Sequence, residues 1–429
     1  MKKILLLGGS RQQIVAIKTA KKLGYHTILC DYLPDNPGQY EVDKFYQIST
    51  IDKKSVYEIA KVEKIDGIFA YASDPAAPTA AYVAEQMKLP GNPYRTVETL
   101  CNKDRFRSFL KENGFHVPEV KVYTETSKAI KDSANFTYPI IVKPVDSSGS
   151  KGVTVLYSEE GIKKAVEFAF SFSGCNRIII EEYIEKKHEY IIGGDIFVLD
   201  GKIVLWGGMN CHRDNTVNPL VPVGKSFPVL LDKEDMDRVH VTLESFVNKI
   251  GYKNGSMNVE LIIDDQNRVY LIDMGPRSGG NMIPDILSDI FDVDIVEMSI
   301  LCAMGERIKC KRMHPKGYYA TQNLHSNKSG IYKEITFDSD IEKYIYRKVL
   351  YKEAGDKVEY FDNATKCLGI IFMKFDSQEE MKKMIENIKE YIHVNLTRGG
   401  VKTFLLIWTA FKENEYNFQN CHLEMEVAA

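Results

Sequence analysis

The first 90 residues alternate short apolar runs with stretches of helical periodicity, and this alternation limits the fold more than any other feature of the chain. Residues 3–7 are apolar, Gly8-Gly9-Ser10 interrupts them, and apolar residues then recur at helical spacing before Gly24. The pattern continues with expected strands at 27–31, 44–48 and 66–71 and expected helices at 55–62 and 76–87. Strands that alternate with helices predict a parallel sheet covered by helices on both faces.

Length and charge restrict the class of protein. At ~150 residues per domain, 429 residues predict two to four domains. The 44% hydrophobic and 27% charged residues are typical of ordered globular proteins. A net charge of −3 gives no overall positive field, so we expect neither nucleic acid nor a membrane surface as a partner, although a local basic groove stays open.

Neither a membrane span nor a zinc site is expected. The longest apolar runs, such as Ile4–Leu7 and Phe404–Trp408, are far shorter than the ~20 residues that cross a bilayer, and the N-terminus lacks the pattern of a secretory signal. These features predict a cytoplasmic protein. The eight cysteines are scattered without a Cys-x-x-Cys pair, which favours reduced thiols over zinc ligands or disulfides.

The rest of the chain divides at its turn residues. Turn formers cluster at 89–93 and mark a first boundary, which gives an α/β domain over 1–100. A second domain is expected over 101–315, with a lid subdomain at about 120–185 built as strand, loop, strand, helix and strand. Residues 189–209 and 256–273 predict antiparallel hairpins, with a helix at 233–250 between them. Residues 316–429 are expected to form a small α/β cap, with a strand at 370–375 and a helix at 378–391.

Three glycine-containing turns raise the question of phosphate binding. The turn at 8–13 lacks the third glycine of the dinucleotide fingerprint, and Pro219 excludes a Walker A loop at 219–226. The small residues of Asp146–Gly152 stand between two expected strands, where successive N–H groups can approach phosphate oxygens, and Lys143 just before them supplies a positive charge. A plain hairpin is the alternative interpretation.

A carboxylate interrupts each of two apolar strands that a short turn pairs. These are Glu260 and Asp273, and burying them together is costly unless a cation compensates, so Mg²⁺ with nucleotide phosphates is a natural partner. A solvated sheet edge is the alternative. Arg277 lies in a turn with Ser278-Gly279-Gly280-Asn281 that can aim its guanidinium at a phosphate or carboxylate, and a surface salt bridge is the other interpretation.

Taken together, these motifs resemble the ATP-grasp superfamily in both order and spacing. The resemblance rests on Lys103, Val142-Lys143-Pro144, the Ser/Gly loop, Glu181-Glu182-Tyr183-Ile184, His188-Glu189-Tyr190, Glu260 and Asp273-x-Gly-Pro-Arg277. It covers residues 1–315 well, including an N-terminal α/β domain like those that precede the ATP-grasp module. Residues 316–429 match only loosely the C-terminal cap of carboxylase-like members. The fold it implies is a Rossmann-like parallel sheet domain, an ATP-grasp module of two α+β subdomains and a small α/β cap.

The resemblance also implies a role for each motif residue. Lys103 and Lys143 would contact ATP phosphates, and Glu260 and Asp273 would bind Mg²⁺, or Mn²⁺ in its place. Arg277 would stabilise the transferred phosphoryl group or the acyl phosphate. The adenine and ribose would be bound by Glu181, Glu182, Tyr183, Ile184 and Glu189. The lid over the phosphates would consist of Ser147, Ser148, Gly149, Ser150, Lys151 and Gly152.

Two departures from the family pattern bear on metal and substrate. Many members carry glutamate and then asparagine where this chain has Asp273 and Gly275, which puts a second metal in doubt. The run Gly275-Pro276-Arg277 is similar to that of amino-acid ligase-like branches. Substrate contacts are expected from the turn and from the polar loop after residue 209, at His212, Arg213, Arg277, Gly279, Gly280 and Asn281.

The resemblance implies an ATP-dependent carboxylate–amine ligase that acts through an acyl phosphate on an amino acid or a similar small acid, with an amine as second substrate. Two alternatives stay open. One is a bicarbonate-activating enzyme of the carboxylase or carbamoyl-phosphate type, and the other is an ATP-binding regulatory protein without turnover. A homodimer is expected by analogy with relatives alone.

Overall fold

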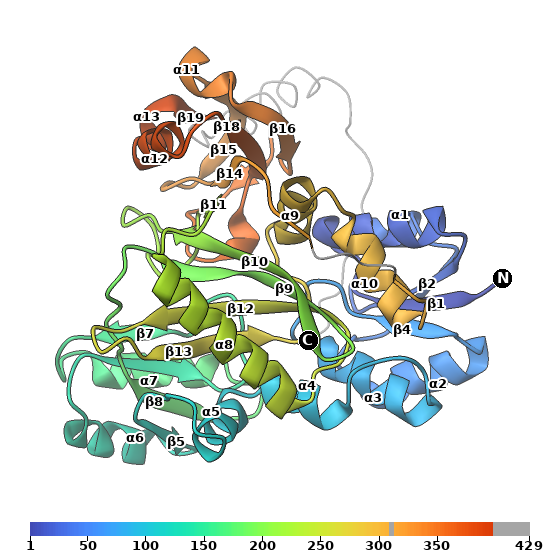
Figure 1. Cartoon of the computed structure of the whole chain (residues 1–429), viewed down its shortest axis with the longest axis horizontal. Coiled ribbons are helices and arrows are strands. Elements are labelled where there is room, and N and C mark those ends of the chain that lie inside the picture. The colour runs from blue at the N-terminus through green and yellow to red at the C-terminus, as the bar shows by residue number, and fades with distance from the viewer. Residues whose placement is uncertain (309–312, 398–429) are drawn as a thin grey trace, which may run out of the picture.

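A computed structural model describes residues 1–308 and 313–397 of the chain. It contains a parallel N-terminal sheet, a lid sheet and a large central sheet that continues into the C-terminal residues, with a further small sheet there (Figure 1). The mixed α/β class expected from the sequence is therefore confirmed. Cys310, Cys421 and Phe404–Trp408 lie outside the described residues, as do 398–429 of the expected cap.

The N-terminal sheet has the strand order β3-β2-β1-β4, with all neighbours parallel. Its elements are β1 (Lys3–Leu7), α1 (Ile14–Lys22), β2 (His26–Asp31), β3 (Lys44–Gln47), α2 (Lys53–Glu63), β4 (Gly67–Phe69) and α3 (Ala77–Met87). Four of the five residues of β1 are buried, as expected for a central parallel strand. The predicted alternation of strands and helices is confirmed, with bounds that differ by a few residues.

Two helices lead from this sheet into the lid. They are α4 (Tyr94–Leu100), which the sequence reading left out, and α5 (Lys103–Glu112). The lid sheet follows in the order β5-β8-β6-β7. Its elements are β5 (Val120–Tyr123), α6 (Thr126–Asp132), β6 (Ile140–Pro144), β7 (Thr154–Leu156), α7 (Ile162–Ser171) and β8 (Ile178–Glu182). The predicted order of strand, loop, strand, helix and strand over 140–182 is confirmed.

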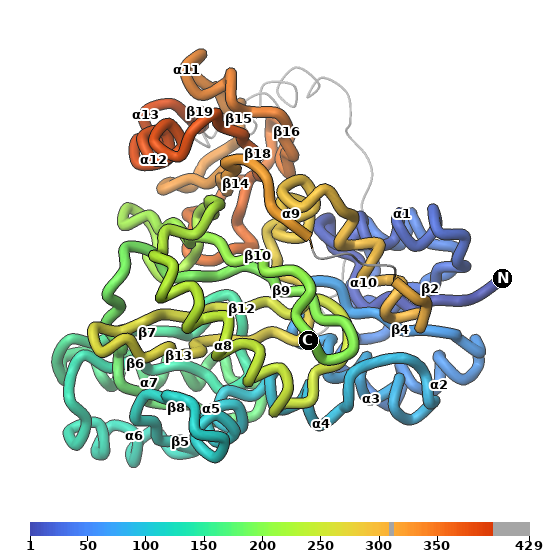
Figure 2. Tube along the Cα trace, viewed as in Figure 1, coloured from blue at the N-terminus to red at the C-terminus, as the bar shows by residue number. Residues whose placement is uncertain are grey.

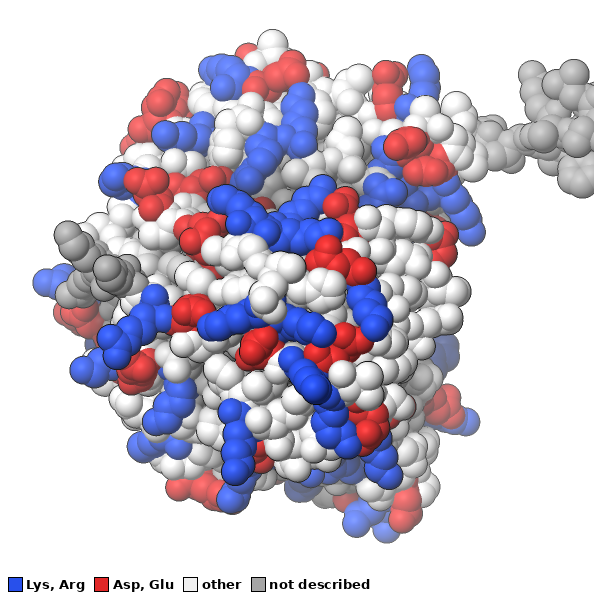
Figure 3. All heavy atoms as spheres, turned by 90° about the vertical axis from the view of Figure 1, so that its right-hand side faces the viewer, with Lys and Arg blue, Asp and Glu red and all other residues white. Residues whose placement is uncertain are grey.

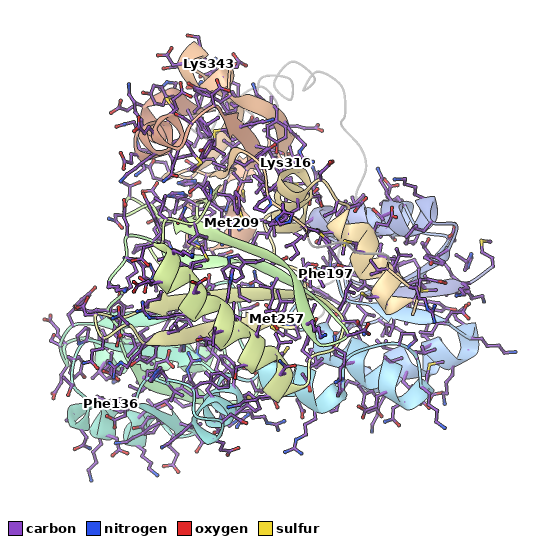
Figure 4. The ribbon with its side chains drawn as sticks, in the orientation of Figure 1. Phe136, Phe197, Met209, Met257, Lys316 and Lys343 are labelled. Carbon is purple, nitrogen blue, oxygen red and sulfur yellow. The ribbon has the colours of Figure 1, made fainter. Side chains whose placement is uncertain are left out.

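The central sheet has the order β13-β12-β9-β10-β11-β14-β18-β16. Its first part comprises β9 (Ile191–Leu199), β10 (Lys202–His212), β11 (Gly224–Phe227), α8 (Lys233–Ile250), β12 (Gly255–Ile263), β13 (Val269–Gly275), α9 (Ile283–Phe291) and α10 (Ile295–Ala303). Both predicted hairpins and the predicted helix 233–250 are confirmed. Helix α8 covers one face of the sheet (Figure 1). Phe246 of this helix and Met257 of β12, which is labelled in Figure 4, are fully buried in the same core cluster.

The C-terminal residues extend the central sheet rather than only covering it. Strands β14, β18 and β16 pair into it, while β17-β15-β19 form a separate small sheet. The elements are β14 (Tyr318–Leu324), β15 (Gly330–Phe337), α11 (Ser339–Glu342), β16 (Ile345–Leu350), β17 (Lys357–Val358), β18 (Gly369–Phe375), α12 (Gln378–Glu386), α13 (Ile388–Tyr391) and β19 (Ile392–Thr397). The single helix predicted at 378–391 was wrong, because the backbone leaves the helical region at Asn387.

The chain path places the lid and the C-terminal elements at opposite ends of the central sheet, with the N-terminal domain beside it (Figure 2). Helix α10 lies against α1 and so joins the central part to the N-terminal sheet. On the face shown in Figure 3, basic and acidic side chains are interspersed, in keeping with the small net charge. Within residues 1–308 and 313–397, no helix has the length and apolar character needed to cross a bilayer. The six described cysteines are all free thiols.

Candidate active site

The two predicted carboxylates are direct cross-strand partners. In the β12/β13 hairpin, Glu260 lies opposite Asp273, next to a bulge between Glu260 and Leu261. Both side chains are half-buried, and neither has a hydrogen-bond or ion-pair partner among the residues that the structure describes. Like charges directly opposite each other destabilise a sheet, so this arrangement favours a bound cation. The expected pairing is confirmed, and metal binding stays a prediction.

A buried ion cluster lies between the lid sheet and this hairpin. Arg107 of α5 is 1% exposed and donates to Glu181 Oε2 of β8 at 3.1 Å and to the Ile272 carbonyl of β13 at 2.9 Å. Lys143 of β6 forms an ion pair with the same Glu181. Burial raises the pKa of Glu181, but the charges of Arg107 and Lys143 outweigh it and hold this pKa at about 2. The two cations thus bind one carboxylate, which leaves the cluster with a positive charge.

Burial lowers the pKa of Lys143, an effect that the charges of Arg107 and Lys103 increase and that Glu181 opposes. Sequence reasoning missed Arg107, although its place beside Phe106 and three residues before Leu110 puts it on the apolar side of α5. The side chain of Glu181, expected at the adenine edge, is turned into this cluster instead. Its role toward adenine stays a prediction.

The small-residue loop is held from two sides. Lys103 donates from Nζ to the Ser147 carbonyl at 2.6 Å, and Ser150 donates from Oγ to the Leu220 carbonyl at 2.8 Å. Arg213 donates to the same Leu220 carbonyl, so it contacts the segment that meets the loop. Gly149 and Gly152 adopt positive φ angles of 66° and 73°, which glycine tolerates best. The loop therefore lies between the first turn of α5 and the β10–β11 connection.

The predicted substrate turn is fixed to the N-terminal domain. Arg277 donates from Nε to Asp74 Oδ1 at 2.7 Å, and Asp74 follows the carboxyl end of β4. The Asn281 N–H donates to Gln12 Oε1 at 3.1 Å. Sequence reasoning missed Asp74, whose position at the carboxyl end of a parallel strand was a usable signal. The turn thus joins the strand that carries Asp273 to the N-terminal sheet.

The Gly279 N–H, which was expected to contact substrate, already donates hydrogen bonds within the protein. The Gly279 N–H donates to both oxygens of Asp195 of β9, at 3.0 and 2.8 Å. Asn258 Nδ2 donates to the same carboxylate at 2.9 Å. Burial raises the pKa of Asp195, against the opposing effect of these hydrogen bonds. Because the Gly279 N–H is occupied, the Gly280 N–H is the other amide of this turn that could donate to an oxyanion.

Among the described residues, no hydrogen bond or ion pair joins the remaining predicted residues to the carboxylate pair. His212 is buried, 2.9 Å from Ser226 Oγ, and burial lowers its pKa to about 4. Glu189 is half exposed and forms an ion pair with Lys382 of α12 at 3.4 Å. Glu182 is exposed and Tyr183 donates its N–H to the Pro139 carbonyl, while Ile184 follows in the same segment. Ser148 lies in the loop 147–152, where the neighbouring Ser147 and Ser150 make the hydrogen bonds described above.

Charged groups from three parts of the chain converge around Cys101. Burial raises the pKa of this thiol, and the charges that act on it are those of Asp74, Arg277, Asp273 and Lys103. Arg107 lies one helical turn after Lys103 and reaches both Glu181 and the strand of Asp273. Three residues predicted from the sequence, Lys103, Asp273 and Arg277, therefore lie close enough to act on one thiol. Among the described residues, no set of three or more His, Cys, Asp or Glu side chains forms a separate metal site.

Residues 102–311 match the family model described as carbamoyl-phosphate synthase L chain, ATP binding domain. The chain is 23% identical over 291 residues to the carbamoyl phosphate synthase large chain of Vibrio parahaemolyticus, a match that covers 64% of this chain and 27% of that protein. The chain thus spans about a quarter of the length of such relatives.

Two solved structures are similar over nearly the whole chain. The L-amino acid ligase from Bacillus licheniformis aligns with a TM-score of 0.78 at 19% identity, covering 93% of this chain and 99% of that one. The phosphoribosylglycinamide synthetase from Anaerococcus prevotii aligns with a TM-score of 0.72 at 22% identity, covering 92% and 100%. At these identities the likeness shows a shared fold.

Proposed function

We propose that the chain is an ATP-dependent carboxylate–amine ligase of the ATP-grasp type, because residues 102–311 match the model of the carbamoyl-phosphate synthase L chain ATP binding domain. The observation that carries the proposal is that, within the part of the chain that the structure describes, the carboxylates of the β12/β13 hairpin lack cations, while the buried cations beside the hairpin lack enough carboxylates. Among the described residues, Glu260 and Asp273 stand side by side with no hydrogen-bond or ion-pair partner, while Arg107 and Lys143 share the single carboxylate Glu181 and Lys103 has only a backbone carbonyl. A magnesium ion with a polyphosphate matches both sets of charges.

The donor set fits magnesium. Two carboxylates on one face of a hairpin supply hard oxygen ligands, and Mg²⁺ commonly binds one or two carboxylates together with phosphates and water. When bound, the ion offsets the charge of the phosphates and polarises the transferred phosphoryl group. Gly275, across the hairpin from Asn258, supplies no side-chain ligand. One metal held by Glu260 and Asp273 is therefore the minimum that this chain supports.

The reaction follows from the charges. A carboxylate oxygen attacks the γ-phosphorus, the bond to the β–γ bridging oxygen breaks, and ADP leaves with that electron pair. An amine then attacks the acyl carbon, phosphate leaves with the C–O electrons, and the amine loses a proton. Lys103, Lys143 and Arg277 offset the negative charge of the transferred group. The loop 147–152 excludes water, which would hydrolyse the acyl phosphate.

The acceptor in this proposal is an amino acid or a similar small acid. Its support is the Gly275-Pro276-Arg277 run together with the fold shared with the L-amino acid ligase. Arg277 and the Gly280 amide are the substrate contacts proposed here. ATP binds to the lid residues and to the segment 181–184, with Glu189 near the ribose.

The test is release of phosphate from ATP with amino acids, dipeptides or bicarbonate as acceptors, followed by the mass of the product. Amine-dependent release with an amide product supports the ligase. Bicarbonate dependence supports the carboxylase-type alternative, and tight ATP binding without release in any mixture supports a regulatory protein. The substitution Glu260→Gln should abolish release. The matched control is Asp265→Asn, in the exposed turn of the same hairpin, which should retain it.

A further inference from the structure

A β-bulge interrupts the strand that carries Asp273. In the β12/β13 hairpin, Glu260 pairs with Asp273. The next residue of β12, Leu261, pairs with Leu271, two positions before Asp273. Ile272 is therefore the extra residue of β13 in this register. Bulges are frequent at sheet edges and next to active sites, where they change the direction of a side chain. This one lies directly before the predicted metal ligand.

The bulge decides which face of the sheet Asp273 occupies. Leu271 and Asp273 are two positions apart and would share a face in a regular strand, yet their partners on β12 are consecutive residues, which point to opposite faces. The packing shows the same shift, because Val269, Leu271 and Met274 belong to one core cluster at a spacing of two and then three residues. Regular alternation would instead place Asp273 in that core.

Arg107 of α5 binds the backbone at this bulge. Its Nη1 donates to the Leu271 carbonyl at 3.3 Å and its Nη2 to the Ile272 carbonyl at 2.9 Å. Strand β13 is the first strand of the central sheet, so its outer edge has no neighbouring strand among the described elements, apart from an isolated bridge between His116 and Tyr270. The buried guanidinium therefore supplies hydrogen-bond donors where the sheet ends.

The guanidinium is held from its other side by the lid sheet. Nε and Nη2 of Arg107 donate to the two oxygens of Glu181, at 3.1 and 3.4 Å. The guanidinium carbon lies 5.3 Å from the ring centre of the adjacent Phe106. Donors on all three nitrogens thus have acceptors, which fixes the plane of the group. Lysine carries its donors on a single nitrogen and lacks this planar arrangement.

Charge balance does not account for Arg107. Glu181 already has Lys143 as a counter-charge, and these two groups alone would form a matched buried pair. Arg107 adds a second cation, whose burial carries a cost in free energy. Its remaining hydrogen bonds go to the two carbonyls at the bulge. The contribution that distinguishes Arg107 from Lys143 is therefore the geometry that it imposes on β13.

We propose that Arg107 is a positioning residue for the metal site: it holds the bulge of β13 and so directs Asp273 to the face of Glu260 and away from the core. This inference rests on the proposed magnesium- and ATP-dependent function, and it adds a residue that the motifs do not contain. Arg107 acts through Asp273 and does not itself bind the ion. Because the same guanidinium binds Glu181, one side chain joins the lid sheet to the metal carboxylates.

The first experiment measures how much magnesium strengthens the binding of ADP. Calorimetry gives the dissociation constant of ADP in EDTA and in excess magnesium chloride, and the ratio of the two constants reports the contribution of the metal. Arg107→Lys keeps a charge beside Glu181 but loses the planar group. The ratio should therefore fall about 10-fold, or to one where the parent ratio is smaller, as is typical when a residue behind a metal ligand is changed. The constant in EDTA should stay within threefold.

The matched control is Arg105→Lys, at an exposed position of the same helix that pairs with Glu98, and it should leave the ratio unchanged. Three results overturn the inference. The first is an Arg107→Lys protein whose ratio lies within twofold of the parent value. The second is equal weakening of ADP binding with and without magnesium, since Arg107 would then act on the nucleotide through Glu181 alone. The third is a parent chain whose ADP binding does not depend on magnesium.

Failure of the ligase function gives a different result. A parent chain whose ADP binding depends on magnesium and on Arg107, but which releases no phosphate with any acceptor, supports the positioning role while the ligase function fails. Acceptor-dependent phosphate release together with an unchanged ratio in Arg107→Lys has the opposite meaning.

The second experiment uses Arg107→Met, which leaves Glu181 and Lys143 as a matched pair and also replaces the lysine variant in the first experiment if that variant does not fold. Amide hydrogen exchange should become faster in residues 269–275 of the Arg107→Met protein. MgADP should protect these residues less in the variant than in the parent chain. Exchange in β18, which is separated from β13 by several strands of the sheet, should not change. Unchanged exchange at 269–275 in a folded Arg107→Met protein overturns the inference.

Discussion

Two charged regions of the molecule differ in how their charges are paired. One is the lid cluster, formed by Arg107, Lys143 and Glu181, and the other is the floor of the central sheet, formed by Glu260, Asp273 and Lys225 of β11. Arg107, Lys143 and Glu181 bind one another, and Arg107 also binds carbonyls of β13. Glu260 and Asp273 have no partner among the described residues, and Lys225 has only a thiol.

This difference separates two tasks. The lid cluster connects the lid sheet to the central sheet and therefore contributes to the folded state. The floor keeps unmatched charges where ligands of opposite sign would bind, at a cost in stability that is common at functional sites. Mutations in the two regions should consequently change stability in opposite directions.

The largest effect is expected from Glu181→Gln. It leaves Arg107 and Lys143 buried as like charges without a carboxylate, so unfolding free energy should fall by about 3–5 kcal/mol at neutral pH. Chemical denaturation measures this loss. Glu182→Gln, on the next and exposed position of β8, is the control and should change stability by less than about 0.5 kcal/mol. Equal small losses in both variants would show that the cluster does not stabilise the fold.

The same cluster predicts a pH dependence. The pKa of Glu181 falls from 4.5 to about 2 on folding, so its contribution is fully present above pH 4.5 and is lost as the pH falls through 2. The difference in unfolding free energy between the parent chain and Glu181→Gln should therefore shrink as the pH is lowered from 4.5 toward 2. Denaturation curves at a series of acidic pH values measure it. A difference that stays constant over this range contradicts the assignment.

A smaller effect distinguishes the two buried lysines. Lys143→Met removes a partner of Glu181 and should lower unfolding free energy by about 1.5–3 kcal/mol, the worth of a hydrogen bond between charged groups. Lys225→Met removes an ammonium without a counter-charge and should leave unfolding free energy unchanged or raise it by up to about 1 kcal/mol. Denaturation of both variants without ligands makes the comparison. A larger loss for Lys225→Met would reverse the contrast between the regions.

How far the sequence predicts these regions depends on how local their contacts are. Glu260 and Asp273 stand on strands joined by a short turn, so their pairing follows from alternation and turn residues alone. The alternation of residues 3–87 likewise predicts the N-terminal sheet, because its strands and helices follow one another directly.

The missed residues depend on contacts between distant segments. Arg107 resembles an ordinary charged helix residue until α5 packs between Glu181 and β13. Asp74 acquires a partner only when the turn at Arg277 meets the N-terminal domain, 203 residues away in sequence. Lys225 lies on a strand of four residues, whose pairing with β10 spans a long connection. Such contacts carry no periodic signal in the sequence.

The smallest predicted effect tests the floor itself. The double substitution Glu260→Gln and Asp273→Asn removes two like charges that face each other across the hairpin, so without metal it should raise unfolding free energy by about 0.5 kcal/mol. Magnesium chloride with ADP should stabilise the parent chain and leave the double variant unaffected, because a ligand stabilises only the state that binds it. Urea denaturation with and without MgADP, at matched ionic strength, measures both effects.

Asp265→Asn, in the exposed turn, should keep the magnesium response. A double variant that loses stability without metal, or that gains as much from MgADP as the parent, would mean that this pair stabilises the sheet and that the floor differs from the lid cluster in degree only.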